Sequence, residues 1–221
     1  MPIVRGEGLE CLLEGGVIQV NRVDGTPGEG PHSQRAPSRY YDHTKRTDRV
    51  EVAKYEAVET LRDGRQATIR ALRPGDRDGL LEAVAGSSTQ SLYRRFFSPK
   101  RAFTEGEIAF FVNIDFITHV ALVAVVEESG RPMIVGGGRY IVVEPEKAEV
   151  AFAVVDQNQG QGIGAALLHH LAAIARNAGL QELIAEVLPD NTPMLKVFEK
   201  GGFGLGMKRE PGVVHVTLRL F

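Results

Sequence analysis

The chain of 221 residues has a net charge of −2 and a pI near 6.3, and 43 % of its residues are hydrophobic. This balance suits one globular domain with some attached length, and it excludes the basic excess typical of nucleic-acid binders and membrane-surface proteins. A single cysteine, Cys11, excludes an internal disulfide and argues against a cysteine-ligated zinc site. Neither a signal-peptide pattern nor an apolar run of roughly 18 residues is present. We therefore expect a cytoplasmic protein with no metal, nucleic-acid or membrane partner.

Composition divides the chain into an N-terminal arm, residues 1–55, and a folded domain, residues 56–221. Residues 25–38 (GTPGEGPHSQRAPS) contain no large apolar side chain, and residues 39–54 are highly charged. Such segments bury too little apolar surface to offset the entropy lost on ordering. We expect the arm to be flexible or only partly ordered.

The first part of the domain predicts a hairpin followed by three helices. Asp63-Gly64 between two apolar stretches is a strong short-range hairpin signal. Asp76 is expected to cap a helix with leucine and valine at helical spacing, and residues 91–97 form a second helix. Thr104 and Glu107 match a capping box, which predicts the start of a third helix.

The next part of the domain predicts an antiparallel meander. Short turns separate three adjacent apolar runs. These runs cover residues 119–126, 133–143 and 149–155.

Beyond the meander the pattern changes to alternating helices and strands. A long helix over residues 165–178 is stopped by Gly179, a typical residue just beyond a helix end. A strand (183–188), a helix (193–200) and a last strand (213–220) follow. The spacing implies a right-handed parallel crossover. The predicted fold is mixed α/β: an antiparallel meander, then a parallel βαβ crossover, with helices on both faces of the sheet.

A glycine-rich loop joins the last meander strand to the long helix. Gly160, Gly162 and Gly164 leave backbone N–H groups free to face a ligand, at a helix end that carries about half a positive charge. This predicts an anion site, most naturally for phosphate. A tight turn without a ligand is the simpler alternative.

A dinucleotide site is the second alternative, because the same residues fit G-x-G-x-x-G/A. Residues 156–159 separate the loop from its strand, however, and a meander precedes it where a first parallel strand would stand. Only about 55 residues follow, too few for several further crossovers.

At this point the sequence resembles the GNAT superfamily of N-acetyltransferases, over roughly Gln66 to Phe221. The family signature Q/R-x-x-G-x-G/A is matched by Gln159, Gly162 and Gly164. The later signature, an asparagine followed by a helix ending in K-x-G-F, looks like Asn191 through Lys200-Gly201-Gly202-Phe203. Both motifs occur in the family's order and at its spacing.

The resemblance implies acetyl-CoA as co-substrate and assigns its site to three parts of the chain. The strand before the loop would bind the pantetheine arm through its backbone, the loop would wrap the pyrophosphate, and Asn191 would line the cofactor side of the neighbouring strand. The strand residues are Phe152, Ala153 and Val154, and the loop residues are Gln159, Gly160, Gln161, Gly162, Ile163, Gly164 and Ala165.

Glu149 is the candidate general base. Lysine has an unperturbed pKa of about 10.4, so a base must remove a proton before the amine can attack. Some lysine acetyltransferases of the superfamily place a catalytic glutamate at this position, and backbone N–H near Val154 would stabilise the oxyanion. A solvated carboxylate beside Lys147 is the alternative. Phe198 stands where many members have a tyrosine general acid, so the thiolate would leave unassisted or take a proton from water.

A narrower resemblance concerns the acceptor. Residues 91–97 (SLYRRFF) and 119–124 (HVALVA) look like the acetyltransferase module of bacterial protein-lysine acetyltransferases. Arg94, Arg95, Lys100 and Arg101 form a basic cluster that would contact a cofactor phosphate or an acidic partner, with a solvated helix face as the alternative.

The resulting hypothesis is direct transfer of an acetyl group to a primary amine, with a protein lysine as the leading acceptor. A small amine or polyamine acceptor, and a non-catalytic acyl-CoA-binding regulatory domain, are the alternatives. A homodimer remains open.

Overall fold

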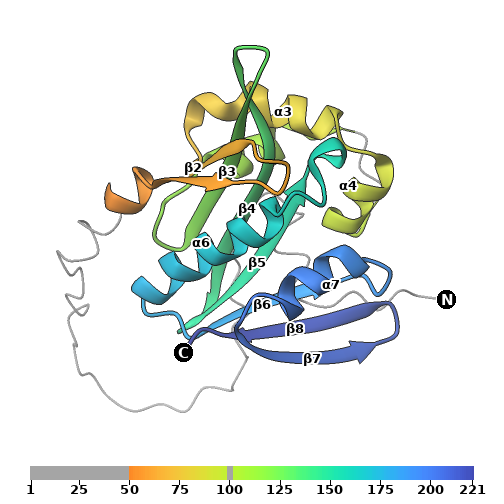
Figure 1. Ribbon diagram of the computed structural model, residues 1–221. Helices are drawn as coiled ribbons and strands as arrows, with labels where there is room; N and C mark the ends of the chain where they lie inside the picture. The colour runs from red at the N-terminus through yellow and green to blue at the C-terminus, as the bar shows by residue number, and fades with distance from the viewer. Residues whose placement is uncertain (1–49, 99–101) are drawn as a thin grey trace, which may run out of the picture.

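The computed structural model describes residues 50–98 and 102–221, so most of the predicted arm, together with Lys100 and Arg101, lies outside the described residues. The described chain folds into one eight-stranded sheet in the order β1-β2-β3-β4-β5-β6-β8-β7 (Figure 1). The strands are β1 (Glu56–Thr60), β2 (Gln66–Ala71), β3 (His119–Glu128), β4 (Arg131–Glu144), β5 (Lys147–Val154), β6 (Glu182–Val187), β7 (Gly204–Glu210) and β8 (Val213–Arg219). The α-helices among these elements are α3 (Arg77–Ala85), α4 (Thr89–Phe96), α5 (Glu105–Val112), α6 (Ile163–Asn177) and α7 (Thr192–Glu199).

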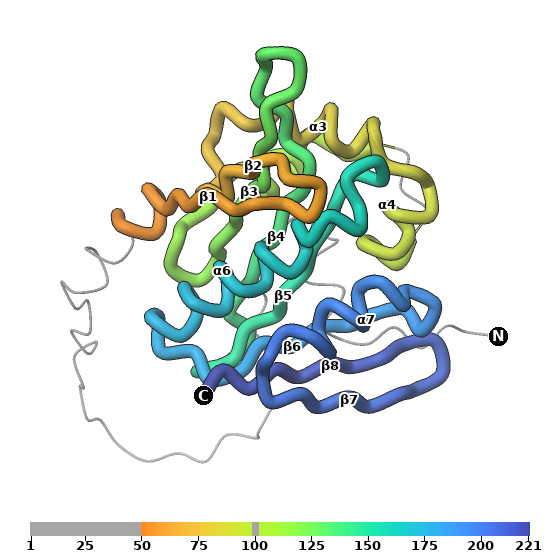
Figure 2. Tube along the Cα trace, viewed as in Figure 1, coloured from red at the N-terminus to blue at the C-terminus, as the bar shows by residue number. Residues whose placement is uncertain are grey.

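The strand pairing confirms the antiparallel meander and the single parallel step. Strands β1 to β5 pair antiparallel in chain order, and β6 then lies parallel to β5. The parallel step runs from β5 through α6 to β6, and the sheet then returns to antiparallel pairing, because β8 pairs antiparallel with both β6 and β7. Figure 2 shows the β6-β8-β7 unit turned away from the first four strands, with β5 between the two groups.

Helices cover both faces of the sheet, as predicted. Along β3, Val120 and Leu122 face the larger core, which also holds the buried leucines of α6 and α7. The alternate residues Ala121 and Val123 face a smaller core with Leu80 of α3. This alternation follows from the two-residue period of a strand.

Two glycines of β4 set how closely α6 approaches the sheet. A Cβ at Gly136 would lie 2.9 Å from Ile163 Cγ2, and one at Gly138 would lie 2.7 Å from Phe152 Cδ1 and 3.0 Å from Leu171 Cδ1. Real Cβ atoms do not approach that closely, so only glycine permits this packing. The N-terminus of α6 is thereby held against β4, next to the end of β5.

Of the two helix caps predicted from the sequence, one is confirmed and one was wrong. Thr104 Oγ1 accepts a hydrogen bond from the Glu107 amide at 3.2 Å, and Glu107 Oε2 accepts one from the Thr104 amide at 2.9 Å, which confirms the capping box. Asp76 makes no cap bond to α3. Its carboxylate instead accepts from the Arg73 amide and binds the Arg70 guanidinium at 2.7 Å. A short 3-10 turn, Pro74–Asp76, therefore precedes α3.

The C-terminal half contains a strand that the sequence analysis missed. The predicted end of α6 is confirmed, because Gly179 has a φ of +81° and its amide donates to Arg176 O. Strand β7 was not predicted, because Gly204, Gly206 and a run of charged residues resemble a loop. It is held by pairing with β8 and forms an edge of the sheet.

Residues next to the predicted domain boundary also contact the core. Val52 and Tyr55 pack against it from the chain just before β1. The Tyr55 hydroxyl and His170 Nδ1 lie 2.5 Å apart, and His170 Nε2 lies 2.8 Å from Glu59 Oε1. This short chain of polar contacts joins the start of the domain to α6.

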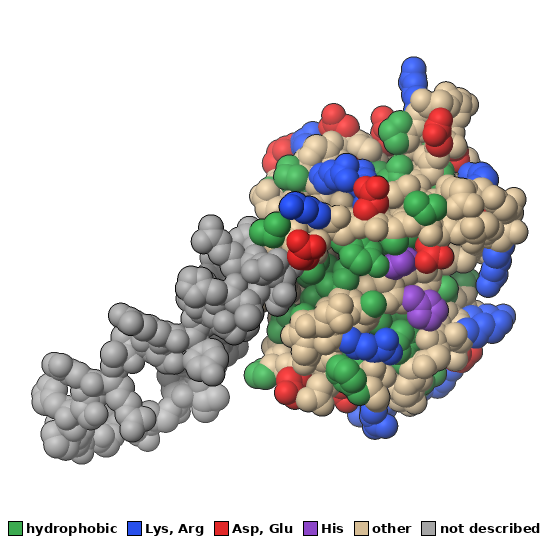
Figure 3. Space-filling model, turned by 60° about the vertical axis from the view of Figure 1, so that its left-hand side comes forward, with side chains coloured by type: hydrophobic (Ala, Val, Ile, Leu, Met, Phe, Trp, Pro, Cys, Tyr) green, Lys and Arg blue, Asp and Glu red, His purple; other side chains and the backbone are tan. Residues whose placement is uncertain are grey.

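The face shown in Figure 3 carries acidic and basic side chains interspersed, with apolar side chains between them. No helix in residues 50–98 and 102–221 is both long enough and apolar enough to span a bilayer.

Candidate active site

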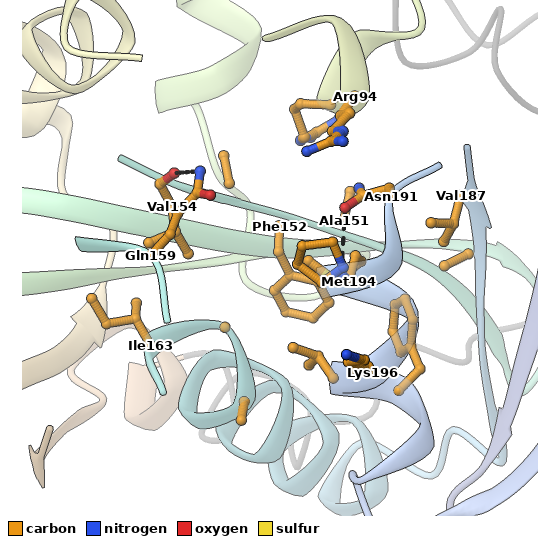
Figure 4. A pocket seen from close by; sticks show the side chains of 18 of the residues that line it. Arg94, Ala151, Phe152, Val154, Gln159, Ile163, Val187, Asn191, Met194 and Lys196 are labelled. Carbon is orange, nitrogen blue, oxygen red and sulfur yellow. Dashed lines mark hydrogen bonds between the residues drawn. The ribbon is translucent and has the colours of Figure 1, made fainter. Parts of the chain in front are cut away.

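A cleft opens where β5 and β6 stop pairing. The two strands are in register only from Lys147 to Glu149, although β5 continues to Val154 and β6 to Val187. The separation leaves a cavity of about 510 Å³. Its walls come from β5, the glycine loop, the start of α6, β6, α7 and α4 (Figure 4).

The open edge of β5 presents backbone groups to this cleft. The Val155 amide donates to Val135 O on β4, and hydrogen bonding alternates along an antiparallel pair. The backbone groups of Ala153 therefore face β4, whereas those of Phe152 and Val154 face the cleft. Of the three predicted pantetheine-binding residues, Ala153 lines the cleft without offering it a backbone hydrogen bond.

The glycine loop places a helix N-terminus at the same cleft. Gly160 and Gly162 have φ values of +78° and +97°, in the left-handed region that side chains rarely adopt. Gly162 is the N-cap of α6, and the first helical hydrogen bond runs from the Ala166 amide to Gly162 O at 3.0 Å. The amides of the preceding residues, 163–165, have no partner within the helix, and free amides at a helix N-terminus favour an anion.

The side chain of Gln159 fixes the loop to β5 and α4. Its Nε2 donates to Val154 O and to Ser91 Oγ, both at 3.1 Å, and Figure 4 shows this side chain beside Val154. The bond to Val154 O occupies the carbonyl at the end of β5, so the Val154 amide is the free backbone group there.

Several basic side chains line the cleft. Arg62 lines it from the β1–β2 turn, with its amide donating to Gln161 O at 3.1 Å and its Nη1 donating to Gly160 O at 3.0 Å. Lys196 and Lys200 line it from α7 and its end. Cations beside a helix N-terminus favour a phosphorylated ligand.

Glu149 occupies the point where β5 and β6 separate. Burial raises the pKa of its carboxyl to about 7, Glu186 of β6 raises it further by like-charge repulsion, and Arg95 of α4 opposes the rise. The alternative of a solvated carboxylate beside Lys147 does not fit, because Glu149 is half-buried in the cleft wall, and Lys147 pairs with Glu144 at 2.9 Å. Glu149 therefore titrates near neutral pH.

Most of the predicted site residues meet at this cleft. It is lined by Glu149, Phe152, Ala153, Val154, Gln159, Gly160, Gly162, Ile163, Gly164, Ala165 and Asn191. Gln161 is outside this lining and instead joins the loop to Arg62. Asn191 has a second role as N-cap of α7, where its Oδ1 accepts from the Met194 amide at 3.4 Å.

Several cleft residues were missed or misinterpreted from the sequence. Arg95 is not on a solvated face but lies beside Glu149, and Arg94 forms an ion pair with Asp190 at 3.4 Å. The four-residue spacing of Ser91 and Arg95 on one helix could have indicated that they share a face. No local signal connects Arg62 or Glu186 with the loop, because both arrive through the folding of distant strands.

A comparison with models of known protein families shows which family the chain belongs to. The family model described as the acetyltransferase (GNAT) family matches residues 88–203, more than half of the chain. The chain belongs to the GNAT acetyltransferase family.

Individual relatives agree with this family. Acetyltransferase Pat of Mycolicibacterium smegmatis is 31 % identical over 156 residues, which cover 70 % of this chain and 46 % of Pat. Acetyltransferase PA5475 of Pseudomonas aeruginosa is 32 % identical over 127 residues, 57 % of this chain and 68 % of the relative. This chain thus spans less than half the length of Pat.

Among solved structures, the GNAT domain of S. lividans PAT is similar to this chain. The two are 35 % identical with a TM-score of 0.67, and the match covers 74 % of this chain and 96 % of that domain.

The charges around Glu149 predict opposite effects of two substitutions. Glu186→Gln removes a like charge and should lower the pKa of Glu149 below about 7, whereas Arg95→Gln removes an opposite charge and should raise it. A carboxyl ¹³C NMR titration measures both, with Glu144→Gln as an exposed control. Shifts in the same direction, or no shift, would show that these neighbours do not set the pKa of Glu149.

Proposed function

We propose that this GNAT domain binds acetyl-CoA in the cleft between β5 and β6 and transfers the acetyl group directly to a primary amine. The opening of the sheet beyond Glu149 is the observation that supports this proposal most strongly. It exposes one edge of β5 to an extended ligand and puts an anion site at one end of that edge.

In this proposal the pantetheine arm hydrogen-bonds the backbone of Phe152 and Val154. The pyrophosphate accepts hydrogen bonds from the amides of Gly160 to Ala165, including Gln161 through its backbone alone. Arg62, Lys196 and Lys200 add positive charge around the phosphates. Asn191 shapes the far wall through its cap of α7.

Glu149 acts as general base in the proposed reaction. A base whose pKa is about 7 is largely ionised just above neutral pH and still accepts a proton effectively. It takes a proton from the ammonium of the acceptor, and the neutral amine then attacks the thioester carbonyl. The free amide of Val154 donates to the oxyanion of the tetrahedral intermediate. The nitrogen then loses its second proton to water or to the departing sulfur, and the intermediate collapses to the amide product and coenzyme A.

Direct attack is favoured over a covalent acetyl-enzyme. Ser91 places a hydroxyl on the cleft wall, but no histidine occurs among the described residues that line the cleft. This hydroxyl accepts from Gln159 and hydrogen-bonds Asp156, whose lowered pKa makes it a weak base for activating a nucleophile. Phe198 supplies no acid, because a phenyl ring has no ionisable proton; the ring is buried and its centre lies 6.2 Å from that of Phe152. A thiolate with a pKa near 8.5 can leave without one.

The leading acceptor is a protein lysine, and the support is the similarity to the Pat proteins. A small amine or polyamine is the alternative acceptor. Mass spectrometry of a cell lysate and a panel of amines, each incubated with acetyl-CoA and the protein, separates the two. Binding of acetyl-CoA without any acetylated product would instead favour a regulatory acyl-CoA sensor.

Glu149→Gln tests the base. We expect kcat/KM to fall by about 10²–10⁴-fold, because an amide cannot accept the proton. The unmodified protein should gain activity as pH rises through about 7, where Glu149 becomes ionised, and the variant should lose this dependence. The Kd for acetyl-CoA should be unchanged, and Glu144→Gln serves as control. An unaltered rate and pH profile would remove Glu149 from the mechanism.

Gly162→Ala tests the loop. An alanine at φ +97° costs about 1–2 kcal/mol and distorts the anion site, so the Kd for acetyl-CoA should rise about tenfold or more in calorimetry. Gly179→Ala places the same strain, at φ +81°, at the other end of α6. It should lower the melting temperature without changing the Kd. Equal effects of both substitutions on affinity would exclude a specific role for the loop.

A further inference from the structure

A second, smaller cavity adjoins the cleft on the face of the sheet covered by α3, α4 and α5. It measures about 120 Å³, and Arg95 lines both cavities. Small residues form its floor, among them Gly137 of β4 and Ala151 and Ala153 of β5. The absence of bulky side chains there leaves room for a ligand group directly beside β5.

Strand register places the charged groups around this floor. Glu149, Ala151 and Ala153 alternate on one face of β5, and Arg139 of β4 lies opposite Ala151. Arg95 approaches the same region from α4. Glu149 and Arg95 therefore meet where β5 enters the cleft, and Arg139 lines the adjoining cavity on the same face of the sheet.

The Arg139 guanidinium has only neutral partners among the described residues. Its Nη1 lies 3.1 Å from His119 Nε2, its Nη2 donates to Phe111 O at 3.5 Å, and it lies 4.6 Å from the centre of the Phe111 ring. His119 is uncharged at neutral pH, because burial and the nearby Arg139 lower its pKa to about 4. These contacts stabilise the guanidinium but none of them supplies a negative charge.

Arg95 also lacks a strong partner within the described chain. It lies 4.9 Å from the centre of the Phe96 ring, no hydrogen bond joins it to another described residue, and Glu149 is the carboxylate that acts on it. Burial lowers the pKa of Arg95 to about 10, and burial together with repulsion from Arg95 lowers that of Arg139 to about 9. Two half-buried cations on this face of the sheet, one of them beside Glu149, leave an excess of positive charge that a bound anion would offset.

We propose that Arg95, supported by Arg139, binds a carboxylate of the acceptor, so that the substrate is an amine with a carboxylate close to it. A planar carboxylate fits the guanidinium fork, and the small-residue floor gives it access from the cleft. Such an anchor holds the amine within reach of Glu149. Free amino acids and lysines flanked by acidic residues in a protein share this chemistry. The inference rests on the proposed acetyl transfer.

Paired acceptors test the inference. Lysine is compared with cadaverine, which lacks the carboxylate, and a glutamate-flanked lysine peptide is compared with its glutamine-flanked counterpart. We expect the carboxylate member of at least one pair to have a kcat/KM about 30-fold higher or more. The first pair reports on free amino acids, and the second on proteins.

Substitutions of Arg95 test whether this residue causes the preference for acceptors with a carboxylate. The preference is the ratio of kcat/KM for the carboxylate member of a pair to that for its partner. Arg95→Gln should bring this ratio close to one, and Arg95→Lys should retain part of it. Substitution of the exposed Arg73 in Arg73→Gln should leave the ratio unchanged. The ratio within a pair cancels the effect of Arg95 on the ionisation of Glu149. No preference in either pair, or an equal loss for both members in Arg95→Gln, overturns the inference.

A binding measurement separates this inference from the proposed function. The folded protein loaded with coenzyme A is titrated with the same four acceptors by calorimetry, and melting curves verify the fold of each variant. Selective, Arg95-dependent binding of the carboxylate members without turnover would support the pocket and refute acetyl transfer. Turnover without selectivity would refute the pocket alone. No selective binding and no turnover would refute both.

Discussion

The separation of β5 from β6 after Glu149 is the constraint on which the rest of the site depends. The strands pair over only three residues, and the rings of Phe152 and Phe198 pack together in the core beside the point of separation. Because β5 keeps its pairing with β4, one edge stays fixed while the other stays open. An open strand edge inside a cleft is a ready partner for an extended chain of amides.

The electrostatics of the site depend on the same separation. Glu149 is half-buried and partly desolvated, it is repelled by Glu186, and Arg95 partly compensates its charge. These opposing effects leave its pKa near 7 rather than near that of an exposed carboxyl or a fully buried acid. The glycine-loop end of the cleft differs, because its backbone amides carry partial charges that are independent of pH.

The sequence predicted the features that depend on short-range patterns. The glycine loop, the Thr104–Glu107 capping box and the end of α6 at Gly179 each combine special residues with fixed spacing, and the structure confirms their conformations. The resemblance to family motifs also predicted where the cleft lies in the chain. Which side chain performs chemistry stays a prediction, since the comparisons address the fold and the family rather than individual residues.

Other features depend on long-range contacts and could not be predicted from the sequence. Strand β7 has weak strand propensity and is held by its pairing with β8. The sequence pattern suggested that Asp76 caps a helix, but its carboxylate binds the Arg70 guanidinium. The pattern also suggested that Arg95 lies on the surface, whereas the packing of α4 against β5 places it in the cleft. Arg62 reaches the loop from almost a hundred positions earlier in the chain.

A crystal structure of the protein with coenzyme A tests the central claim most directly. The account predicts that the pantetheine arm lies along β5 between β5 and β6, hydrogen-bonded to the backbone of Phe152 and Val154. The pyrophosphate should lie on the amides of the loop from Gly160 to Ala165. Coenzyme A bound outside this cleft, or inside it with these backbone groups unengaged, would contradict the account.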